Sequence, residues 1–485
     1  MGFYQISEQM LNTAFTENGD KAYTTTGSAC LDYFSIIGGK RHNLVDALNL
    51  FMKSYYEDPR LTIKILFYVR DIRGGLGERS IFRYTFNALA NMYPEVASEL
   101  IKFIPEFGRY DDLLVCLNSP IKKIVLEYID NQLKEDLVNK QNGRPISLLA
   151  KWLPSINTSS IEARNLASII ASSLKMRKEE YRKILSYLRK GLIIENNLRE
   201  VDYSFDYEKV PSNAMFKYRN AFINHDRKRY LDYLEDVKAG KSKINTAALY
   251  PYEIIRRLDE AENRFELDSL DVMWKSFDRS EITSKTIVVR DGSGSMTVSN
   301  NGVSPLDVAT SLAILFSEQL TGEFKDTFIT FSSSPKVIKI KGNTIKEKYD
   351  YISKYRDCSN TDIYKVYKLI LDVYKHKNFK KEDAIDRIVI ISDMEFDCVG
   401  NASKSTFEKF KEEFSNLGYD MPEVVFWNVY ARKNQFPTIN EEGVKLISGS
   451  SSKIIDMVTN NEAFNAYEFM LKCLEKYSCF DEIKL

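Results

Sequence analysis

TIVVRDGSGS, residues 286–295, is the stretch of sequence that decides the fold. Its first half, Thr286 to Val289, is a continuous apolar run that is typical of a buried strand. Its second half places one carboxylate and two hydroxyls, those of Asp291, Ser293 and Ser295, in one tight loop. The intervening glycines let the backbone curl around a centre, and hard oxygen ligands of this kind suit Mg²⁺. The stretch therefore predicts a strand that ends in a metal-binding loop.

Apolar runs and helical stretches alternate along the chain downstream of this loop. The expected strands are 286–289, 327–331, 336–340, 387–391, 423–429 and 444–447. The expected helices are 305–320, 344–355, 362–374, 403–416, 454–458 and 462–477. This alternation predicts a Rossmann-like α/β domain with a mainly parallel sheet covered on both faces. The strand at 336–340 follows a short Ser/Pro turn, which favours an antiparallel edge hairpin.

Two further polar residues fall at positions where such a fold would bring them to the same edge. Thr361 stands at the start of an expected helix, and Asp393 follows the strand at 387–391. Open α/β sheets bind ligands at the carboxyl ends of their strands. A D-x-S-x-S loop alone is often only a turn, but the five residues Asp291, Ser293, Ser295, Thr361 and Asp393 together favour a metal site.

Arg290 is a potential competitor for this site, because its guanidinium could pair with Asp291. Side chains alternate along a strand, so Arg290 is expected to point away from the loop.

The first part of the chain has mainly helical signals. Apolar residues at three- and four-residue spacing occur at 46–56, 80–92 and 179–194, and Pro or Gly separates the stretches. Short helices in series predict an all-α, HEAT-like helical-repeat region. We expect a helical domain at 1–279, linker material around 268–283, and the α/β domain at 284–485.

The charge of the chain is balanced overall but not regionally. The formal net charge is +0. Residues 151–250 nevertheless contain 19 Lys/Arg and 12 Asp/Glu, a local excess of 19 − 12 = +7. The cations of interest there are Lys175, Arg177, Lys178, Arg182, Lys183, Arg189, Lys190, Lys217, Arg219, Arg227, Lys228 and Arg229. They are interleaved with Tyr181, Tyr187, Tyr218 and Tyr230, whose rings could stack on unpaired bases. Ordinary solvated helix faces are the alternative interpretation.

Several classes of protein are not favoured by the sequence. The N-terminus lacks a signal-peptide core, and no apolar run reaches the roughly 18 residues that would cross a membrane. Six scattered cysteines and three histidines suggest reduced thiols in a cytoplasmic protein and no zinc site. No nucleophile motif and no clustered acidic ligands of a two-metal centre are evident, so we expect no enzyme. No preference for DNA is evident.

The five-residue set resembles the metal-ion-dependent adhesion site of von Willebrand factor A domains. That resemblance implies Mg²⁺, or alternatively Mn²⁺ or Ca²⁺. It also implies that the serines and the threonine contact the metal directly and that the aspartates often act through water. One coordination position is then left for an acidic group of a partner.

The whole chain resembles the Ro autoantigen family, in which a ring of helical repeats, the TROVE module, precedes such a domain. The resemblance rests on Thr361-Asp362, on 392–396 and on 250–255. The helical half is more similar to an uncharacterised family of the same layout, at 70–79, 150–155, 210–215 and 240–241. The Ro resemblance implies binding of structured or misfolded RNA.

The leading hypothesis is therefore a non-catalytic RNA-binding ribonucleoprotein component with a Mg²⁺-dependent ligand-binding domain. The first alternative is an adaptor whose metal captures an acidic side chain of a protein partner, without RNA. A metal-dependent hydrolase is the remaining alternative.

Overall fold

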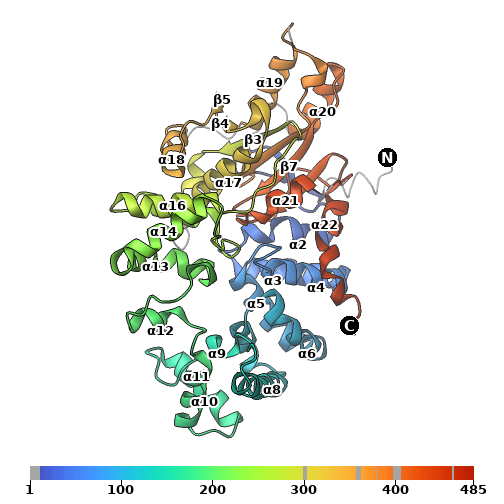
Figure 1. Cartoon of the computed structure of the whole chain (residues 1–485). Coiled ribbons are helices and arrows are strands. Elements are labelled where there is room, and N and C mark those ends of the chain that lie inside the picture. Colours follow the sequence, from blue (N-terminus) through green and yellow to red (C-terminus); the bar gives the residue numbers. More distant parts are fainter. Residues whose placement is uncertain are drawn as a thin grey trace.

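The computed structural model describes residues 11–298, 303–356, 362–377, 379–396, 406–460, 462 and 464–485. In Figure 1 the strands gather in one part of the molecule, and the helices of the first half form an arch that leaves this part and returns to it. The chain thus consists of a helical part and an α/β part, as the sequence predicts.

The α/β part is built on a six-stranded sheet with the order β5-β4-β3-β6-β7-β8. All neighbouring strands are parallel except β5, which lies antiparallel to β4 at the edge. The predicted parallel sheet and its antiparallel edge hairpin are therefore confirmed. The strands are β3 (Thr286–Asp291), β4 (Thr327–Phe331), β5 (Val337–Lys339), β6 (Arg387–Ser392), β7 (Glu423–Asn428) and β8 (Val444–Ser448).

The central strands are covered by helices. Every residue of β3 and β4 is buried, which explains why these strands read as apolar runs and not as alternating patterns. The helix α17 (Pro305–Gln319) packs against both of them and against β6. It begins where Ser304 accepts hydrogen bonds from the first turn and Pro305 fixes the backbone. The other helices are α18 (Ile345–Ser353), α19 (Ile363–Tyr374), α20 (Thr406–Asn416), α21 (Lys453–Asn460) and α22 (Ala466–Leu474).

The helical part is a series of mostly short helices that pack on their sequence neighbours. The helix expected over 179–194 is shorter, because it ends at Arg189 just before Gly191, whose φ is +79°. The helices are α2 (Ala29–Ile36), α3 (Leu44–Glu57), α4 (Pro59–Arg70), α5 (Arg79–Met92), α6 (Pro94–Leu100), α7 (Ile104–Phe107), α8 (Lys122–Gln141), α9 (Leu149–Trp152), α10 (Ile161–Ser173), α11 (Lys178–Arg189), α12 (Ile194–Arg199), α13 (Ser212–His225), α14 (Arg227–Lys238), α15 (Pro251–Leu258) and α16 (Arg264–Lys275).

The chain begins with a feature that an all-α expectation misses. A hairpin of β1 (Thr13–Phe15) and β2 (Lys21–Tyr23) lies against the α/β part, where Tyr23 and Phe436 exchange two backbone hydrogen bonds of 2.9 Å. The following helix α2 packs on β8 and α22. A Cβ atom on Gly38 would lie 2.6 Å from the carbonyl oxygen of Ser448, so this close approach requires glycine. The first helices are thus held against the edge of the sheet that β8 forms.

The two ends of the helical arch also meet each other, around Arg41. Its guanidinium forms a 2.6 Å ion pair with Glu78 and lies 5.3 Å from the ring centre of Tyr250 and 5.6 Å from that of Tyr252. The hydroxyl of Tyr250 donates to the carbonyl of Leu76 at 2.9 Å. The segments 70–79 and 250–255, noted separately in the sequence, therefore join the start and the end of the helical part.

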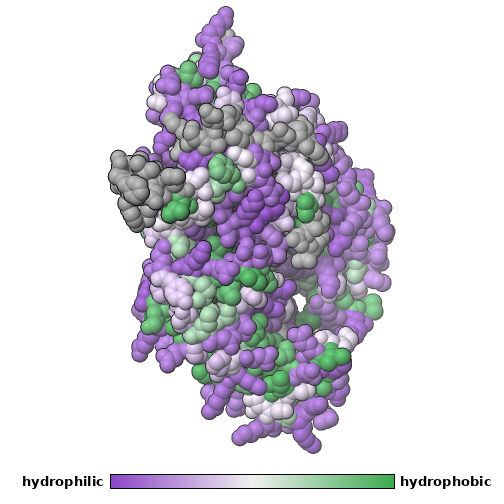
Figure 2. All heavy atoms as spheres, turned by 180° about the vertical axis from the view of Figure 1, so that it is seen from behind, coloured by the Kyte–Doolittle hydropathy of each residue, from purple (hydrophilic) through white to green (hydrophobic). Residues whose placement is uncertain are grey.

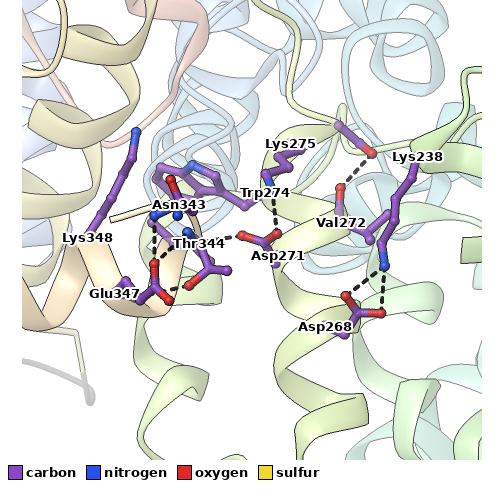
Figure 3. Close-up of polar contacts among 12 residues, drawn as sticks. Lys238, Asp268, Asp271, Val272, Trp274, Lys275, Asn343, Thr344, Glu347 and Lys348 are labelled. Atoms are coloured by element: carbon purple, nitrogen blue, oxygen red, sulfur yellow. Dashed lines mark hydrogen bonds and ion pairs between the residues drawn. The ribbon is translucent and has the colours of Figure 1, made fainter. Parts of the chain in front are cut away.

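The last helices of the arch, α15 and α16, pack on α17 and α18 of the α/β part. Figure 3 shows the polar contacts of α16 there. Asp271 of α16 accepts a 2.8 Å hydrogen bond from the backbone nitrogen of Ile345, in the first turn of α18, and pairs with Lys275 at 2.7 Å. Trp274 donates to Glu318 of α17 at 3.0 Å. The helical part is thus held at both of its ends.

These contacts correct one expectation. The sequence suggested linker material around 268–283, but residues 268–275 belong to α16. Leu270, Met273 and Trp274 are buried there. Their three- and four-residue spacing places them on one face of the helix, and that apolar face outweighs the frequent Asp and Ser of the segment.

The arch leaves an opening that is visible on the surface. Seen from behind, the space-filling view in Figure 2 shows a small hole through the molecule below the α/β part.

Among the described residues, no helix has both the length and the apolar character that crossing a bilayer requires.

Candidate metal centre

The loop after β3 gathers three of the predicted ligands. Asp291 is the last residue of the strand and is fully buried. Its Oδ1 accepts a 2.8 Å hydrogen bond from the backbone nitrogen of Ser293, which curls the loop. The hydroxyl oxygens of Ser293 and Ser295 lie 3.0 Å apart. One carboxylate and two hydroxyls therefore face a common centre.

The neighbouring strand β6 brings a second carboxylate to the same place. The pairing of Arg290 with Ile391 in the parallel register puts the end of β6 beside the end of β3. Ser392 donates to Oδ2 of Asp291 at 2.5 Å. Asp393 follows, is 2% exposed, and accepts from the backbone nitrogen of Glu395 at 3.3 Å. The carboxyl ends of β3 and β6 thus bring together four of the predicted residues, Asp291, Ser293, Ser295 and Asp393.

Burial makes both carboxylates weaker acids, and the charge of Asp393 adds to this effect at Asp291. Burial, followed by the charge of Asp393, raises the pKa of Asp291 to about 7, although hydrogen bonds from Ser392 and Ser293 oppose this. Burial also raises the pKa of Asp393, against a hydrogen bond from Ser295 and the charge of Arg432. Two buried carboxylates whose charges oppose each other favour the binding of a cation between them.

Arg432 supplies a positive charge to this site from the loop after β7. Its guanidinium contacts Oδ2 of Asp393 at 3.0 Å and Oε2 of Glu17 at 2.8 Å. Glu17 belongs to the N-terminal hairpin, and its backbone nitrogen donates to Glu395 at 2.7 Å. One polar network therefore links the proposed metal site with the loop after β7 and the N-terminal hairpin.

Arg290 does not compete for the site. Its side chain donates to the hydroxyl of Thr310 at 3.0 Å and to the carbonyl of Tyr355 at 2.6 Å. The guanidinium lies 5.6 Å from the ring centre of Phe328. As strand alternation predicts, the side chain points away from the loop that follows Asp291.

Thr361 lies outside the described residues. The next residue, Asp362, is the N-cap of α19 and accepts a 3.1 Å hydrogen bond from the backbone nitrogen of Lys365. The helix start that the sequence predicts at this point is present, and α19 packs against β4. The contribution of Thr361 to the site stays a prediction.

The donor set fits a small hard cation. It consists of oxygen atoms only, which Mg²⁺ prefers and which Mn²⁺ and Ca²⁺ also accept. Within the described residues there is no group of three or more His, Cys, Asp or Glu side chains placed to share a metal ion. The cluster of Asp291, Asp393, Ser293 and Ser295 is not of that kind, because it combines only two carboxylates with two serine hydroxyls.

The cations proposed for RNA binding fall into two sets. The first set is exposed on the turn between α10 and α11, on α11 and its C-cap, on α13 and on α14. Its members are Lys175, Arg177, Lys178, Arg182, Lys183, Lys190, Lys217, Arg227, Lys228 and Arg229. Arg229 is nevertheless engaged, because it donates to the carbonyl oxygens of Tyr203 and Phe205.

The second set, Arg189 and Arg219, makes contacts inside the helical part. Arg189 donates to the carbonyl of Ala150 at 2.8 Å, the carbonyl of Leu153 at 2.7 Å and the hydroxyl of Ser155 at 2.6 Å. Arg219 is 7% exposed. These guanidinium groups are turned inward, so they do not belong to an exposed cationic surface.

Two of the four interleaved tyrosines are also internal. Tyr181 and Tyr230 are fully buried, and their hydroxyls contact the carbonyl of Pro154 at 3.0 Å and the hydroxyl of Ser269 at 2.6 Å. Tyr187 is 41% exposed and keeps a ring face available for stacking. The expectation of four accessible rings is therefore wrong for Tyr181 and Tyr230.

Arg432 and Glu17 are the site residues that the sequence did not reveal. They lie 39 residues after Asp393 and at the opposite end of the chain. The one available signal was position, because Arg432 follows the strand β7, which neighbours β6 in the sheet.

Comparisons with known proteins place the chain among relatives. The family profile described as "Domain of unknown function (DUF2828)" matches residues 16–113 and 123–290. A second profile, "Domain of unknown function (DUF7788)", matches residues 285–479. An uncharacterized protein of Acanthamoeba polyphaga mimivirus is 32% identical over 513 residues, which are 96% of this chain and 88% of that protein. The solved structure of the Deinococcus radiodurans Ro (RSR) protein aligns with 9% identity and a TM-score of 0.33, covering 91% of this chain and 93% of that one.

Proposed function

This chain belongs to the DUF2828 family, and we propose that it is a non-catalytic binding protein whose α/β part holds a divalent cation, Mg²⁺ in the first place. The observation that carries the proposal is the convergence of Asp291, Ser293, Ser295 and Asp393 at the ends of two adjacent parallel strands. Through the cation, the site would capture an acidic group of a ligand.

Each residue has a distinct task in this proposal. Ser293 and Ser295 offer neutral hydroxyl oxygens to the cation, and Thr361 would add a third. Asp291 and Asp393 supply the negative charge, directly or through water. A bound divalent cation would contribute an open coordination position that favours a carboxylate of the partner. No general base is assigned to the site, so the proposal includes no chemical turnover.

Titration with Mn²⁺ by calorimetry tests the metal proposal. The full chain is the right material, because the N-terminal hairpin packs against the α/β part. We expect saturable binding by the parent and none by Asp291→Ala. Asp372→Ala, which removes an exposed carboxylate of α19, should bind like the parent. Metal at a hundredfold excess over its Kd should stabilise the parent by about 2.7 kcal/mol. Equal Mn²⁺ affinity of parent and Asp291→Ala would contradict the assignment.

A second function, RNA binding by the helical part, is supported by one specific feature. Arg177, Lys178, Arg182 and Lys183 are all exposed on and just before α11. Among the described residues, none of these four side chains forms an ion pair with a carboxylate. Unpaired cations on one short segment, with Tyr187 exposed beside them, suit the phosphates and bases of a structured or misfolded RNA.

Reversal of these four cations to glutamate tests the RNA proposal. If they contact phosphates, the parent should bind RNA with a log–log salt slope of about −2 to −5, because counterions are released. The reversed variant should bind more weakly and with a flatter slope. Reversal of Lys368 on α19 and of Lys375, the C-cap of that helix, serves as the control and should change little. Parent-like binding by the four-charge variant contradicts this interface.

Two outcomes would redirect the proposal. Absence of RNA binding together with metal-dependent capture of an acidic protein segment would favour an adaptor. Cleavage of RNA, DNA or nucleotides that depends on Mg²⁺ and is lost in Asp393→Ala would instead indicate a hydrolase.

A further inference from the structure

We propose that a pocket between α13 and α15 binds a single nucleotide, through its phosphate and its base together. The pocket has a volume of about 390 Å³ and is lined by Asn213, Phe216, Lys217, Arg219, Asn220 and Arg257. This volume lies within the range of small-molecule sites. The inference rests on the proposed RNA-binding function only where the nucleotide is an unpaired residue of an RNA strand. A free mononucleotide is the other source of the same chemistry.

The positive charge of the pocket is the first argument. Lys217 and Arg257 are exposed at its rim, and Arg219 lies at its wall with only 7% of its surface accessible. Within the described part of the chain, the one carboxylate that forms an ion pair with any of these cations is Glu260, which contacts Arg257. Three cations against one paired carboxylate suit an anionic ligand.

The buried state of Arg219 strengthens this argument. One of its terminal nitrogens donates to the carbonyl of Phe216 at 2.7 Å, but its Nε has no hydrogen-bond partner. Among the residues that the structure describes, no carboxylate forms an ion pair with it. Burial lowers the pKa of Arg219, although Glu266 opposes this effect and Arg257 adds to it. The guanidinium lies 5.1 Å from the ring centre of Phe216, but a buried guanidinium without an ion pair is costly, and an anion in the pocket would stabilise it.

The other lining residues point to more than a simple anion. Asn213, Phe216, Lys217 and Asn220 are spaced at i, i+3, i+4 and i+7, so they share one face of α13. The Phe216 ring and the Arg219 guanidinium beside it are both planes on which a base can stack, and asparagine amides can donate to and accept from a base edge. The amide of Asn213 already donates to the carbonyl of Ala248 at 3.3 Å, which fixes its orientation. Phosphate contacts at the cations and base contacts at the amides together specify a nucleotide.

Calorimetry with the full chain and three probes tests the proposal: adenosine monophosphate, uridine monophosphate and inorganic phosphate. We expect at least one mononucleotide to bind more tightly than phosphate alone. The double variant Lys217→Gln/Arg257→Gln should weaken mononucleotide binding by about tenfold or more, since it removes charged hydrogen-bond donors. Both side chains are exposed, so the fold should survive. Lys123→Gln, an exposed cation of α8 outside the pocket, is the matched control and should bind like the parent.

The outcomes separate the possible sources. Mononucleotide binding that competes with RNA identifies an unpaired RNA residue as the ligand, whereas binding without competition identifies a free nucleotide. If the parent binds a mononucleotide but no RNA, the pocket stands and the RNA proposal fails. If no mononucleotide binds, if phosphate binds as tightly as the mononucleotides, or if the double variant binds like the parent, the nucleotide pocket is wrong, whatever the RNA result.

Discussion

Replacing Arg432 by glutamine should tighten metal binding at the strand edge. The Arg432 guanidinium contacts Oδ2 of Asp393 at 3.0 Å and links it to Glu17. A cation that uses Asp393 must therefore compete with a positive charge that the chain already holds there. Glutamine keeps the size of much of the side chain but removes the charge.

The size of the effect follows from the geometry of this pair. Two unit charges 3.0 Å apart attract with about 5 kcal/mol at an effective dielectric constant near 20. Arg432 is 25% exposed, and it shares its charge with Glu17, so solvent and the second carboxylate reduce the net value. A charged hydrogen bond of about 1.5 to 3 kcal/mol is the appropriate scale. Loss of the competitor should therefore lower the Kd for Mn²⁺ by about tenfold or more.

The assay is calorimetric Mn²⁺ titration of three full-length proteins, with melting temperatures measured in parallel. Lys433→Gln is the matched control, because Lys433 reaches Glu17 at 4.0 Å and does not contact Asp393. The Arg432→Gln protein should melt lower than the parent without metal, since buried Asp393 loses its partner. Mn²⁺ should also raise the melting temperature of Arg432→Gln by more than it raises that of the parent. Mn²⁺ affinity in Arg432→Gln that equals or falls below that of the parent and the control would refute the competition.

Four further predictions concern pH and stability. Because burial and the neighbouring charge raise the pKa of Asp291 to about 7, protons compete with metal below that pH, and Mn²⁺ affinity should be lower at pH 6 than at pH 8 by calorimetry. The same raised pKa means that the metal-free protein loses stability as pH rises from about 4 to about 7, which thermal melts will show as a falling Tm. Arg189→Ala should lower the free energy of unfolding, measured by urea denaturation, by about 2 to 4 kcal/mol, because three acceptors lose their donor. Replacement of the exposed Lys190 by alanine should change the free energy of unfolding little. Gly38→Ala should lower the Tm markedly, because its Cβ would lie 2.6 Å from the carbonyl of Ser448; a parent-like Tm would show that the contact between α2 and β8 relaxes easily.

The sequence by itself determined the sheet and most of the metal loop. Strand β6 contains the continuous apolar run Ile388 to Ile391, and its burial on both faces follows from this local composition. The D-x-S-x-S loop is equally local, because Asp291, Ser293 and Ser295 are held together by neighbouring backbone. Asp393 could be added because adjacent parallel strands end at the same edge of a sheet.

Only the tertiary structure decided which charges are free. Arg182 and Arg189 look alike in the sequence of α11, yet one is exposed and the other donates to the backbone of 150–155. Likewise, Arg432 meets Asp393 and Glu17 only after three distant segments have been packed together. Periodicity reports which face of a helix is apolar, but it carries no information on which distant carbonyl or carboxylate a long cationic side chain will reach.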